Sequence, residues 1–430
     1  MSRSPRAKPS LTTDEIKPTL IAMTLPMLVG MITLMTFNLV DTFFISMLGT
    51  EQLAAISFTF PVSFSLISLA IGLSIGTSAV IARALGAGQL TEARTDGLVA
   101  LWLSAALVML LALAGFVFTE AIFGAMGANE TILLFIRQYM DIWFVGAVLL
   151  VLPMIGNAIL RAAGDTKTPS IIMACSGLVN AVLDPILIFG WGVIPAMGMQ
   201  GAALATLISW VFGSALILYL LVRRDLISTS WIPLAQLLQV CRKILRIGLP
   251  AAGANMLTPL AMAILTAMMA TYGAAAVAAF GVGARLESIA CLVVLALSMT
   301  LPPFVSQNFG AGKLLRVQQA YRLCGRFVML WQFAVYLLMA ALALPLARLF
   351  SAETAVVSII CQFIWIVPLA YGLQGITILT NSSFNALHRP GSALLLSIIR
   401  LFVFYVPLAW LGGSLYGVSG VFIGCVVANL

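Results

Sequence analysis

Charged residues are scarce in this chain. Asp, Glu, Lys and Arg make up 8% of its 430 residues, whereas 62% are hydrophobic and the mean hydropathy is +1.11. A soluble domain carries about 25% charged residues, so no soluble fold of this length can cover so much apolar surface. The sequence therefore predicts an all-α membrane protein that crosses the bilayer many times.

Histidine and closely spaced cysteines are also lacking. The single histidine, His388, lies in a predicted loop, and the six cysteines are scattered without a CxxC motif. These absences argue against histidine-based catalysis, disulfides and metal clusters. We therefore expect a protein that is not an enzyme, with no catalytic residues, no resident metal and no cofactor.

A nucleotide-binding motif is missing as well. The run from Gly164 to Thr168 superficially resembles a phosphate loop, but it lacks a glycine directly before Lys167 and follows a membrane helix. Without an ATP site, the energy for any transport must come from an ion gradient.

The chain divides into twelve apolar segments. They cover residues 16–47, 52–84, 95–118, 130–162, 168–190, 198–222, 236–271, 275–308, 314–349, 353–386, 391–413 and 417 onward. Nearly all exceed the roughly 20 residues that a bilayer-spanning helix needs. Several must therefore tilt, bend or project beyond the membrane.

The distribution of basic residues indicates which ends of these spans lie in the cytoplasm. Most Lys and Arg lie in the N-terminal tail (1–15) and in the connections that follow even-numbered spans, including the linker 223–235. By the positive-inside rule, the N-terminus and these loops are expected in the cytoplasm. The net charge of +8 is then explained without a nucleic-acid partner.

The two halves of the chain repeat each other at an offset of 224 residues. Pro26 matches Pro250, Gly49 matches Gly273 and Asn157 matches Asn381. This duplication predicts two pseudo-symmetric lobes of six helices, an N-lobe (16–222) and a C-lobe (236–430), with the substrate site between them. In this register we expect the twelfth helix to continue about a dozen residues past Leu430.

Two acids lie inside apolar spans. Asp41 falls in the first span and Asp184 in the fifth. The repeat aligns Asp41 with Leu265 and, where its offset shortens to 222 residues, Asp184 with Val406. A charged residue at the centre of a membrane helix costs roughly 2.5–3.5 kcal/mol or more, so such residues usually handle an ion or a proton. Asn180 shares a helix face with Asp184 at a spacing of four residues.

Two further features favour structural roles. Arg285 and Glu287 lie in the eighth span and are predicted to form an ion pair within the C-lobe. The Gly72-xxx-Gly76 pattern is typical of close helix packing.

Several motifs resemble the multidrug and toxic compound extrusion (MATE) family, and its DinF-like branch in particular. The resemblance covers the whole chain, and its motifs are Leu39-Val-Asp41-Thr-Phe-Phe-Ile, Gly86-Ala-Gly88, Gly164-Asp-Thr-Lys-Thr-Pro169, Asn180-Ala-Val-Leu-Asp184-Pro-Ile-Leu-Ile-Phe-Gly190 and Gly198-Met-Gln-Gly201. The resemblance implies a V-shaped pair of six-helix lobes that exchanges a cation for amphiphilic, often cationic drugs.

The resemblance also implies roles for particular residues. Asp41 matches the coupling aspartate and Pro26 a bending point of the first span. Asn180, Asp184 and Tyr139 match the rest of a polar cluster. Thr206 and Asn38, the latter one turn before Asp41, are candidate members.

These observations together predict a multidrug efflux antiporter of a prokaryotic inner membrane, and hence antibiotic resistance. We expect H⁺ or Na⁺ as the coupling ion, with Na⁺ possible at Asp41, Asp184 and Asn180. The expected partners are cationic amphiphilic drugs and membrane lipid, and the expected state is a monomer. The alternatives are a lipid-linked oligosaccharide flippase, which would need a cationic cavity, a membrane enzyme, which would need a catalytic cluster, and a passive channel.

Overall fold

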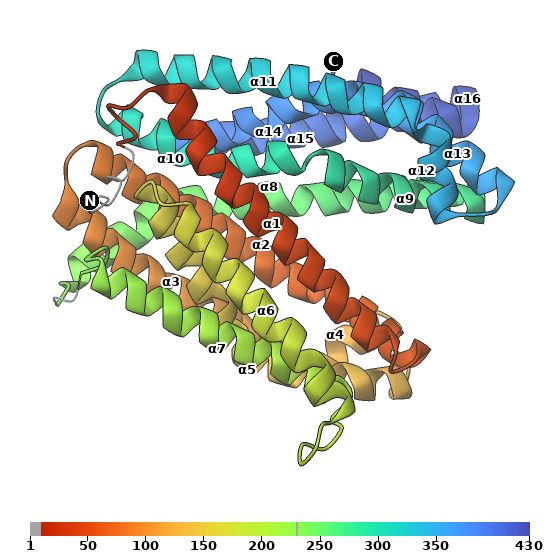
Figure 1. The fold of residues 1–430 in the computed structure, drawn as a ribbon, viewed down its shortest axis with the longest axis horizontal. Coiled ribbons are helices and arrows are strands. Elements are labelled where there is room, and N and C mark those ends of the chain that lie inside the picture. The colour runs from red at the N-terminus through yellow and green to blue at the C-terminus, as the bar shows by residue number, and fades with distance from the viewer. Residues whose placement is uncertain (1–9, 229–230) are drawn as a thin grey trace, which may run out of the picture. The chain divides into compact units, whose positions relative to one another are not determined.

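The protein is described here as a computed structural model that covers residues 10–228 and 231–430. In these residues the regular structure is helical, apart from one isolated bridge between Trp191 and Ile194. The chain forms two compact units (Figure 1). Unit 1 lies within Met1–Ala252 and Ser306–Gly312, and unit 2 within Gly253–Val305 and Lys313–Leu430.

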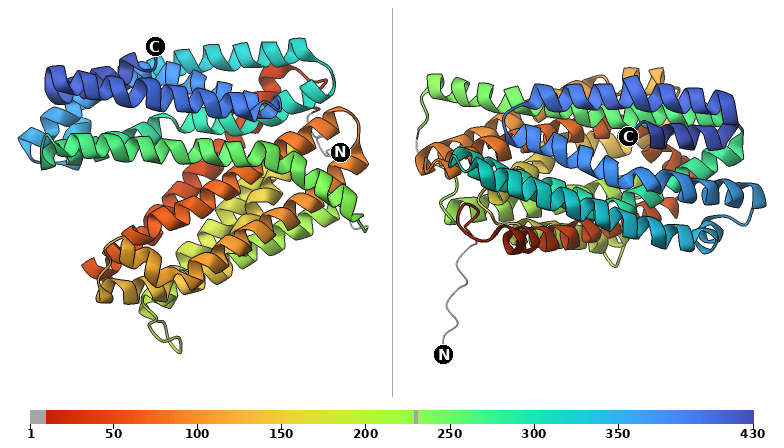
Figure 2. Two further views of the ribbon diagram at one scale, coloured as in Figure 1. Left: turned by 180° about the vertical axis from the view of Figure 1, so that it is seen from behind. Right: turned by 90° about the horizontal axis from the view of Figure 1, so that it is seen from above.

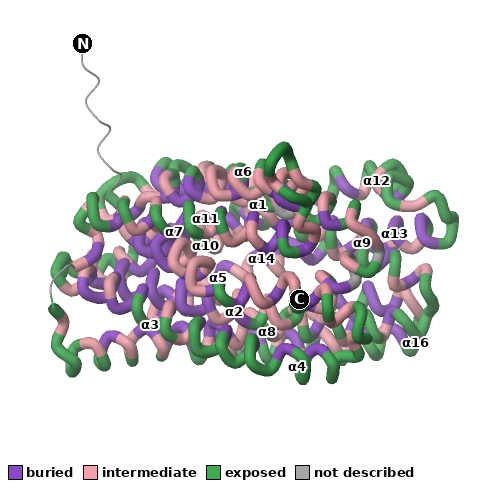
Figure 3. The backbone as a smooth tube through the Cα atoms, turned by 90° about the horizontal axis from the view of Figure 1, so that it is seen from below, coloured by how far each residue is buried: buried purple, intermediate pink, exposed green. Residues whose placement is uncertain are grey.

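Unit 1 is built around one central helix, α5, which packs against α2, α3 and α7, while α6 packs against α1 and α7. Figure 3 shows buried backbone gathered where α3, α5 and α7 run together. The helices are α1 (Ile16–Ser46), α2 (Thr50–Gly86), α3 (Leu90–Val117), α4 (Thr119–Ala125), α5 (Glu130–Ala162), α6 (Lys167–Phe189), α7 (Met199–Arg223) and the first half of α8 (Leu234–Ala270).

Unit 2 holds the second half of α8 and the later helices except the end of α10, which belongs to unit 1; Figure 2 shows these helices from two sides. In this unit α9 packs against α13, and α14 packs against α11 and α15. The elements are α9 (Ala274–Ala290), α10 (Leu292–Gly310), α11 (Leu314–Ala341), α12 (Ala343–Phe350), α13 (Thr354–Ile366), the 3₁₀ turn η1 (Val367–Ala370), α14 (Tyr371–Ala386), α15 (Pro390–Ile398), the π-helical turn η2 (Ile399–Tyr405) and α16 (Val406–Val427).

The predicted spans correspond to these helices, with breaks. The first seven spans are single helices, whereas the eighth divides at Cys291, the ninth at Leu342 and the tenth at η1. Within residues 10–228 and 231–430, eleven helical stretches are long and apolar enough to cross a membrane. This number is one below the expected twelve because the last two spans follow each other without a loop and are counted as Pro390–Val427.

The last two spans form a helical hairpin. Tyr416 and Gly417 have non-helical backbone angles, and Gly417 has a φ of +62°. A Cβ atom on Gly424 would lie 2.2 Å from the carbonyl oxygen of Leu408, although these residues are about 24 Å apart in a straight helix. The chain therefore reverses at Gly417, between the two predicted segments, where a residue without a side chain adopts the left-handed conformation at little cost.

Glycines bring α2 directly against the first half of α8. A Cβ atom on Gly72 would lie 2.3 Å from the carbonyl oxygen of Gly248, and one on Gly76 would lie 2.7 Å from that of Ile244. Both contacts involve backbone atoms, which cannot rotate away as a side chain can. The predicted close-packing role of the Gly72-xxx-Gly76 pattern is thus confirmed.

We expect Gly72→Ala to lower the free energy of unfolding by about 1–3 kcal/mol, because the added methyl group must push two helix backbones apart. Thermal unfolding of the purified protein in detergent measures the effect. Gly124→Ala in α4 is the control, since a Cβ atom there would meet no atom within 4 Å. Equal melting of Gly72→Ala and the control would show that the α2–α8 contact is looser than described.

Candidate functional site

The two intramembrane acids meet across the contact between α1 and α6. Asp41 lies near the end of α1 and is half-buried, whereas Asp184 on α6 is 0% exposed. A side-chain hydrogen bond joins their carboxyl groups. Since an ionised carboxylate can only accept hydrogen bonds, one proton shared between the two acids would satisfy this contact.

Three further polar side chains surround this pair. The Nδ2 atom of Asn180 donates to Oδ1 of Asp184 at 3.3 Å and also lies 3.5 Å from Oγ1 of Thr206 on α7. The hydroxyl of Tyr139 on α5 is hydrogen-bonded to Thr206. Four helices of unit 1 thus contribute to one cluster, and it contains five of the six predicted coupling residues.

No basic side chain in the described part of the chain forms an ion pair with the two acids. The Oδ1 atom of Asp41 and the Oδ2 atom of Asp184 are buried and have no hydrogen-bond partner. The ion pairs found in the described part of the chain include neither acid. Two neighbouring carboxylates cannot both stay ionised in such surroundings without a large free-energy cost. The site can therefore take up a proton or a small cation.

Pro26 and Asn38 also belong to α1. Pro26 lies inside the helix, where it removes the backbone N–H that would bond to the carbonyl of Ala22. Close by, the hydroxyl of Ser170 on α6 lies 3.7 Å from the sulfur of Met27, and a Cβ atom on Gly30 would meet Ser170 at 3.0 Å. The side chain of Asn38 lies outside the described part of the structure.

The predicted partners Arg285 and Glu287 are not brought together. The Oε1 atom of Glu287 accepts a hydrogen bond from Nε2 of Gln374 at 2.7 Å, while Arg285 is exposed. Successive residues turn about 100° around an α-helix, so two residues two positions apart point to different sides. The ion pair is replaced by a hydrogen bond between α9 and α14.

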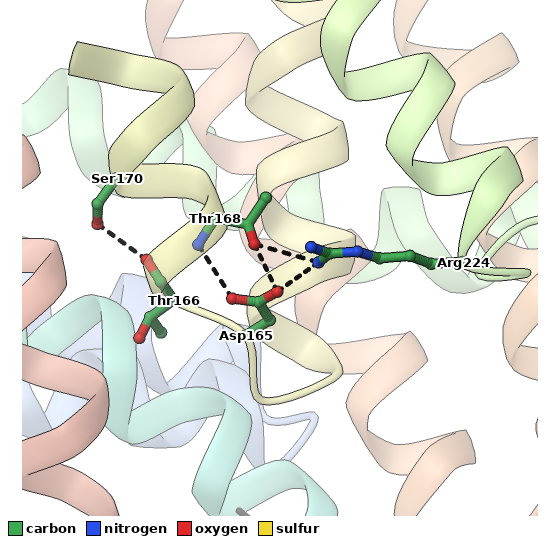
Figure 4. A network of polar contacts seen from close by, with 5 residues as sticks. All are labelled: Asp165, Thr166, Thr168, Ser170 and Arg224. Atoms are coloured by element: carbon green, nitrogen blue, oxygen red, sulfur yellow. Dashed lines mark hydrogen bonds and ion pairs between the residues drawn. The ribbon is translucent and has the colours of Figure 1, made fainter. Parts of the chain in front are cut away.

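The segment that resembles a phosphate loop is the start of α6 (Figure 4). Asp165 accepts hydrogen bonds from the backbone N–H of Thr168 at 3.0 Å and from its hydroxyl at 2.7 Å. Arg224, which follows α7, donates to the same carboxylate and to the Thr168 hydroxyl. The motif therefore caps a helix and links it to the end of α7, and the spacing from Asp165 to Thr168 is typical of such caps.

The pKa of Asp165 reflects this network. Burial alone would raise the pKa of its carboxyl group, but hydrogen bonds from Thr168 and the nearby Arg224 guanidinium outweigh burial and lower the pKa. A lowered pKa in the folded state stabilises the fold above the ordinary aspartate pKa of about 3.9, and this contribution disappears as pH falls through the folded-state value.

The many apolar helices of the fold are typical of a multi-pass membrane protein, and the comparisons identify its family. The MatE family model matches residues 26–186 and 250–411. The chain belongs to the MATE family of transporters. The two matched segments start 224 residues apart (250 − 26), as the internal repeat does.

Three known proteins illustrate the similarity. A Shewanella oneidensis protein named FAD transporter is 43% identical over 96% of this chain and 91% of its own length. The multidrug export protein MepA of Staphylococcus aureus is 26% identical over 94% of this chain and 89% of its own length. The crystal structure of the Vibrio cholerae MATE transporter VcmN in the bent form is 36% identical, with a TM-score of 0.92 over 98% of this chain and 95% of that one.

We expect Asp165→Asn to lower the free energy of unfolding by about 1 kcal/mol at neutral pH, because the charged hydrogen bonds to Arg224 and Thr168 are lost and Arg224 is partly solvated. The difference from the unchanged protein should begin to shrink below about pH 4 and vanish once the pH is below the lowered folded-state pKa of Asp165. Thermal unfolding at pH 7.5 and at low pH tests both statements.

Asp225→Asn is the matched control for this change. Asp225 forms an exposed ion pair with Arg94, and its side chain is 66% exposed, so its removal should alter stability by less than about 0.5 kcal/mol. A pH-independent loss in Asp165→Asn would indicate that the carboxyl charge does not matter.

Proposed function

We propose that this protein exports an organic substrate in exchange for inward proton movement, and that the Asp41–Asp184 pair is the coupling site. The observation that supports this most directly is the contact between two carboxyl groups that form no ion pair with a basic side chain in the described part of the chain. Such a pair binds one proton tightly and releases it when the environment of either acid changes. A transporter needs a site of this kind, because the form with the proton bound and the form without it must favour different conformations.

The proposed conformational change involves α1. The missing backbone hydrogen bond at Pro26 makes α1 easiest to bend in its first half, where Met27 and Gly30 rest on α6. Bending there would move Asp41 relative to Asp184 and open the shared hydrogen bond. One solved relative is in a bent form and another in the straight conformation, which supports two conformations within the family.

An ion gradient supplies enough energy for this exchange. One charge that moves through 100 mV provides about 2.3 kcal/mol. At roughly 150 mV, one net charge per cycle supports a substrate gradient on the order of 300-fold. We propose that the protein works in the cytoplasmic membrane with its N-terminus inside the cell, as the distribution of Lys and Arg indicates.

We infer that a flavin dinucleotide is the favoured substrate. The relative named FAD transporter is 43% identical to this chain, whereas the relatives named for multidrug export or resistance are 26% and 24% identical. Substrate sites diverge with sequence faster than folds do, so the more similar relative carries more weight. Export of cationic amphiphilic drugs, expected from the sequence, is the second candidate and is supported by the less similar relatives.

Asp41→Asn and Asp184→Asn should each reduce gradient-driven transport to the level of empty liposomes, because an amide cannot take up and release a proton. Substrate efflux from proteoliposomes with an imposed pH gradient is the measurement. Asp225→Asn serves as the control, since Asp225 lies on the surface. Transport by Asp41→Asn at the unchanged rate would reject the coupling site, and transport driven by a Na⁺ gradient alone would reject the proton.

The substrate class is tested in the same liposomes. We expect FAD inside the vesicles to be exported under the gradient, and a lipophilic cationic dye to be exported at least about tenfold more slowly, which corresponds to a difference of about 1.4 kcal/mol in the barrier. Export of the dye without export of FAD would instead establish the drug-efflux candidate.

A further inference from the structure

A polar cavity lies between the beginnings of α3 and α8 in unit 1, away from the coupling cluster. Its volume is about 330 Å³, and seven of its eight lining residues are polar. From α3 they include Thr91, Glu92, Thr95 and Asp96, and from α8 they include Gln236, Gln239 and Lys243. Such a set is unusual in a chain with so few charged residues, and the comparisons assign no role to it.

Asp96 is the unexplained group in this cavity. It is 1% exposed, and both of its carboxylate oxygens are buried without a hydrogen-bond partner. An ionised carboxylate removed from water in this way costs several kcal/mol unless a positive group or hydrogen-bond donors compensate it. Lys243 is a positive group that acts on Asp96 from within the same cavity. Because Asp96 also lines the cavity, a ligand that enters there can supply hydrogen-bond donors and further positive charge.

The neighbouring lysine is already engaged. The Nζ atom of Lys243 donates to Oε1 of Glu92 at 2.6 Å. Glu92 lies one helical turn before Asp96, so both acids face the same side of α3. The cavity thus contains two carboxylates and one ammonium group, and one negative charge, that of Asp96, is left over.

We propose that this cavity binds the ammonium group of an organic amine, with Asp96 as its counter-ion. An ammonium group has three hydrogen-bond donors and no acceptor, and the cavity offers carboxylate, amide and hydroxyl oxygens around a single uncompensated charge. A multivalent metal ion is the poorer fit, because the described residues contain no group of three or more His, Cys, Asp or Glu side chains. The volume also exceeds what a bare ion fills.

The position of the cavity indicates how an amine would reach it. Glu92 and Gln236 are each the third residue of a membrane-spanning helix, so the cavity lies near the helix ends, at the depth of lipid headgroups. An ethanolamine headgroup of a lipid and a free amine in the cytoplasm share the required chemistry. Either occupant would join α3 to α8, whose two halves belong to different compact units.

Thermal unfolding in detergent tests the site without reference to transport. We expect a short-chain phosphatidylethanolamine to raise the Tm of the unchanged protein by about 2–4 °C, and the matching phosphatidylcholine, whose quaternary ammonium has no N–H donor, to raise it much less. Millimolar ethanolamine or putrescine distinguishes the sources: a rise with these identifies a free amine, and a rise with the lipid alone identifies the headgroup.

Two variants make the test specific. Asp96→Asn should melt at least as high as the unchanged protein without ligand, because a buried unpaired charge is gone, and it should lose the amine-induced shift. Lys243→Met should enlarge the shift, because it frees Glu92 for the ligand. An equal shift in Asp96→Asn, no shift in any protein, or an equal shift with NaCl or KCl at matched concentration would overturn the proposal.

Discussion

The contact between the carboxyl groups of Asp41 and Asp184 is the constraint on which the rest of the site depends. Two carboxyl groups at hydrogen-bonding distance, without a basic side chain to compensate them, are stable only when one of them holds a proton or when a bound cation lies between them. The packing of α1 on α6 is therefore linked to occupancy of the site. Each change in occupancy alters the free energy of this helix contact, and each change in the contact alters the affinity for the ion.

The α1–α6 seam explains why the acids face each other and not the lipid. On α6, Ser170, Gly177 and Asp184 are spaced by seven residues, so they lie on one face of the helix. Ser170 meets Met27 and a Cβ atom on Gly177 would lie 2.2 Å from the ring of Phe37. Close contacts between α1 and α6 thus continue from Met27 to Asp41, and a bend at Pro26 would have to disturb them.

Much of this arrangement could be predicted from the sequence, and the exceptions have physical causes. The cost of burying Asp41 and Asp184 identified the acids, but Tyr139 and Thr206 lie on other helices and were indicated only by family resemblance. The predicted Arg285–Glu287 ion pair was wrong because two residues two positions apart on an α-helix point to different sides, although they are close in sequence. Asp96 was overlooked because an acid near a helix end normally faces water, and only the tertiary packing shows that it does not.

The internal repeat preserves several proline and glycine positions but not the intramembrane acids. The halves share positions such as Pro26 and Pro250 or Gly49 and Gly273. The Asp41–Asp184 pair nevertheless lies in unit 1, while Glu287 in unit 2 is hydrogen-bonded to Gln374. In the proposed exchange of one proton at the Asp41–Asp184 pair, the charge of the substrate decides how the membrane potential contributes. Proton entry and export of an anionic dinucleotide both move positive charge inward, so the potential drives both, at about 2.3 kcal/mol per charge per 100 mV. Proton exchange for a monovalent cation cancels that term and leaves only the pH gradient. With one proton per cycle, the ion gradient therefore provides a larger driving force for export of an anionic flavin dinucleotide than for export of a monovalent cation.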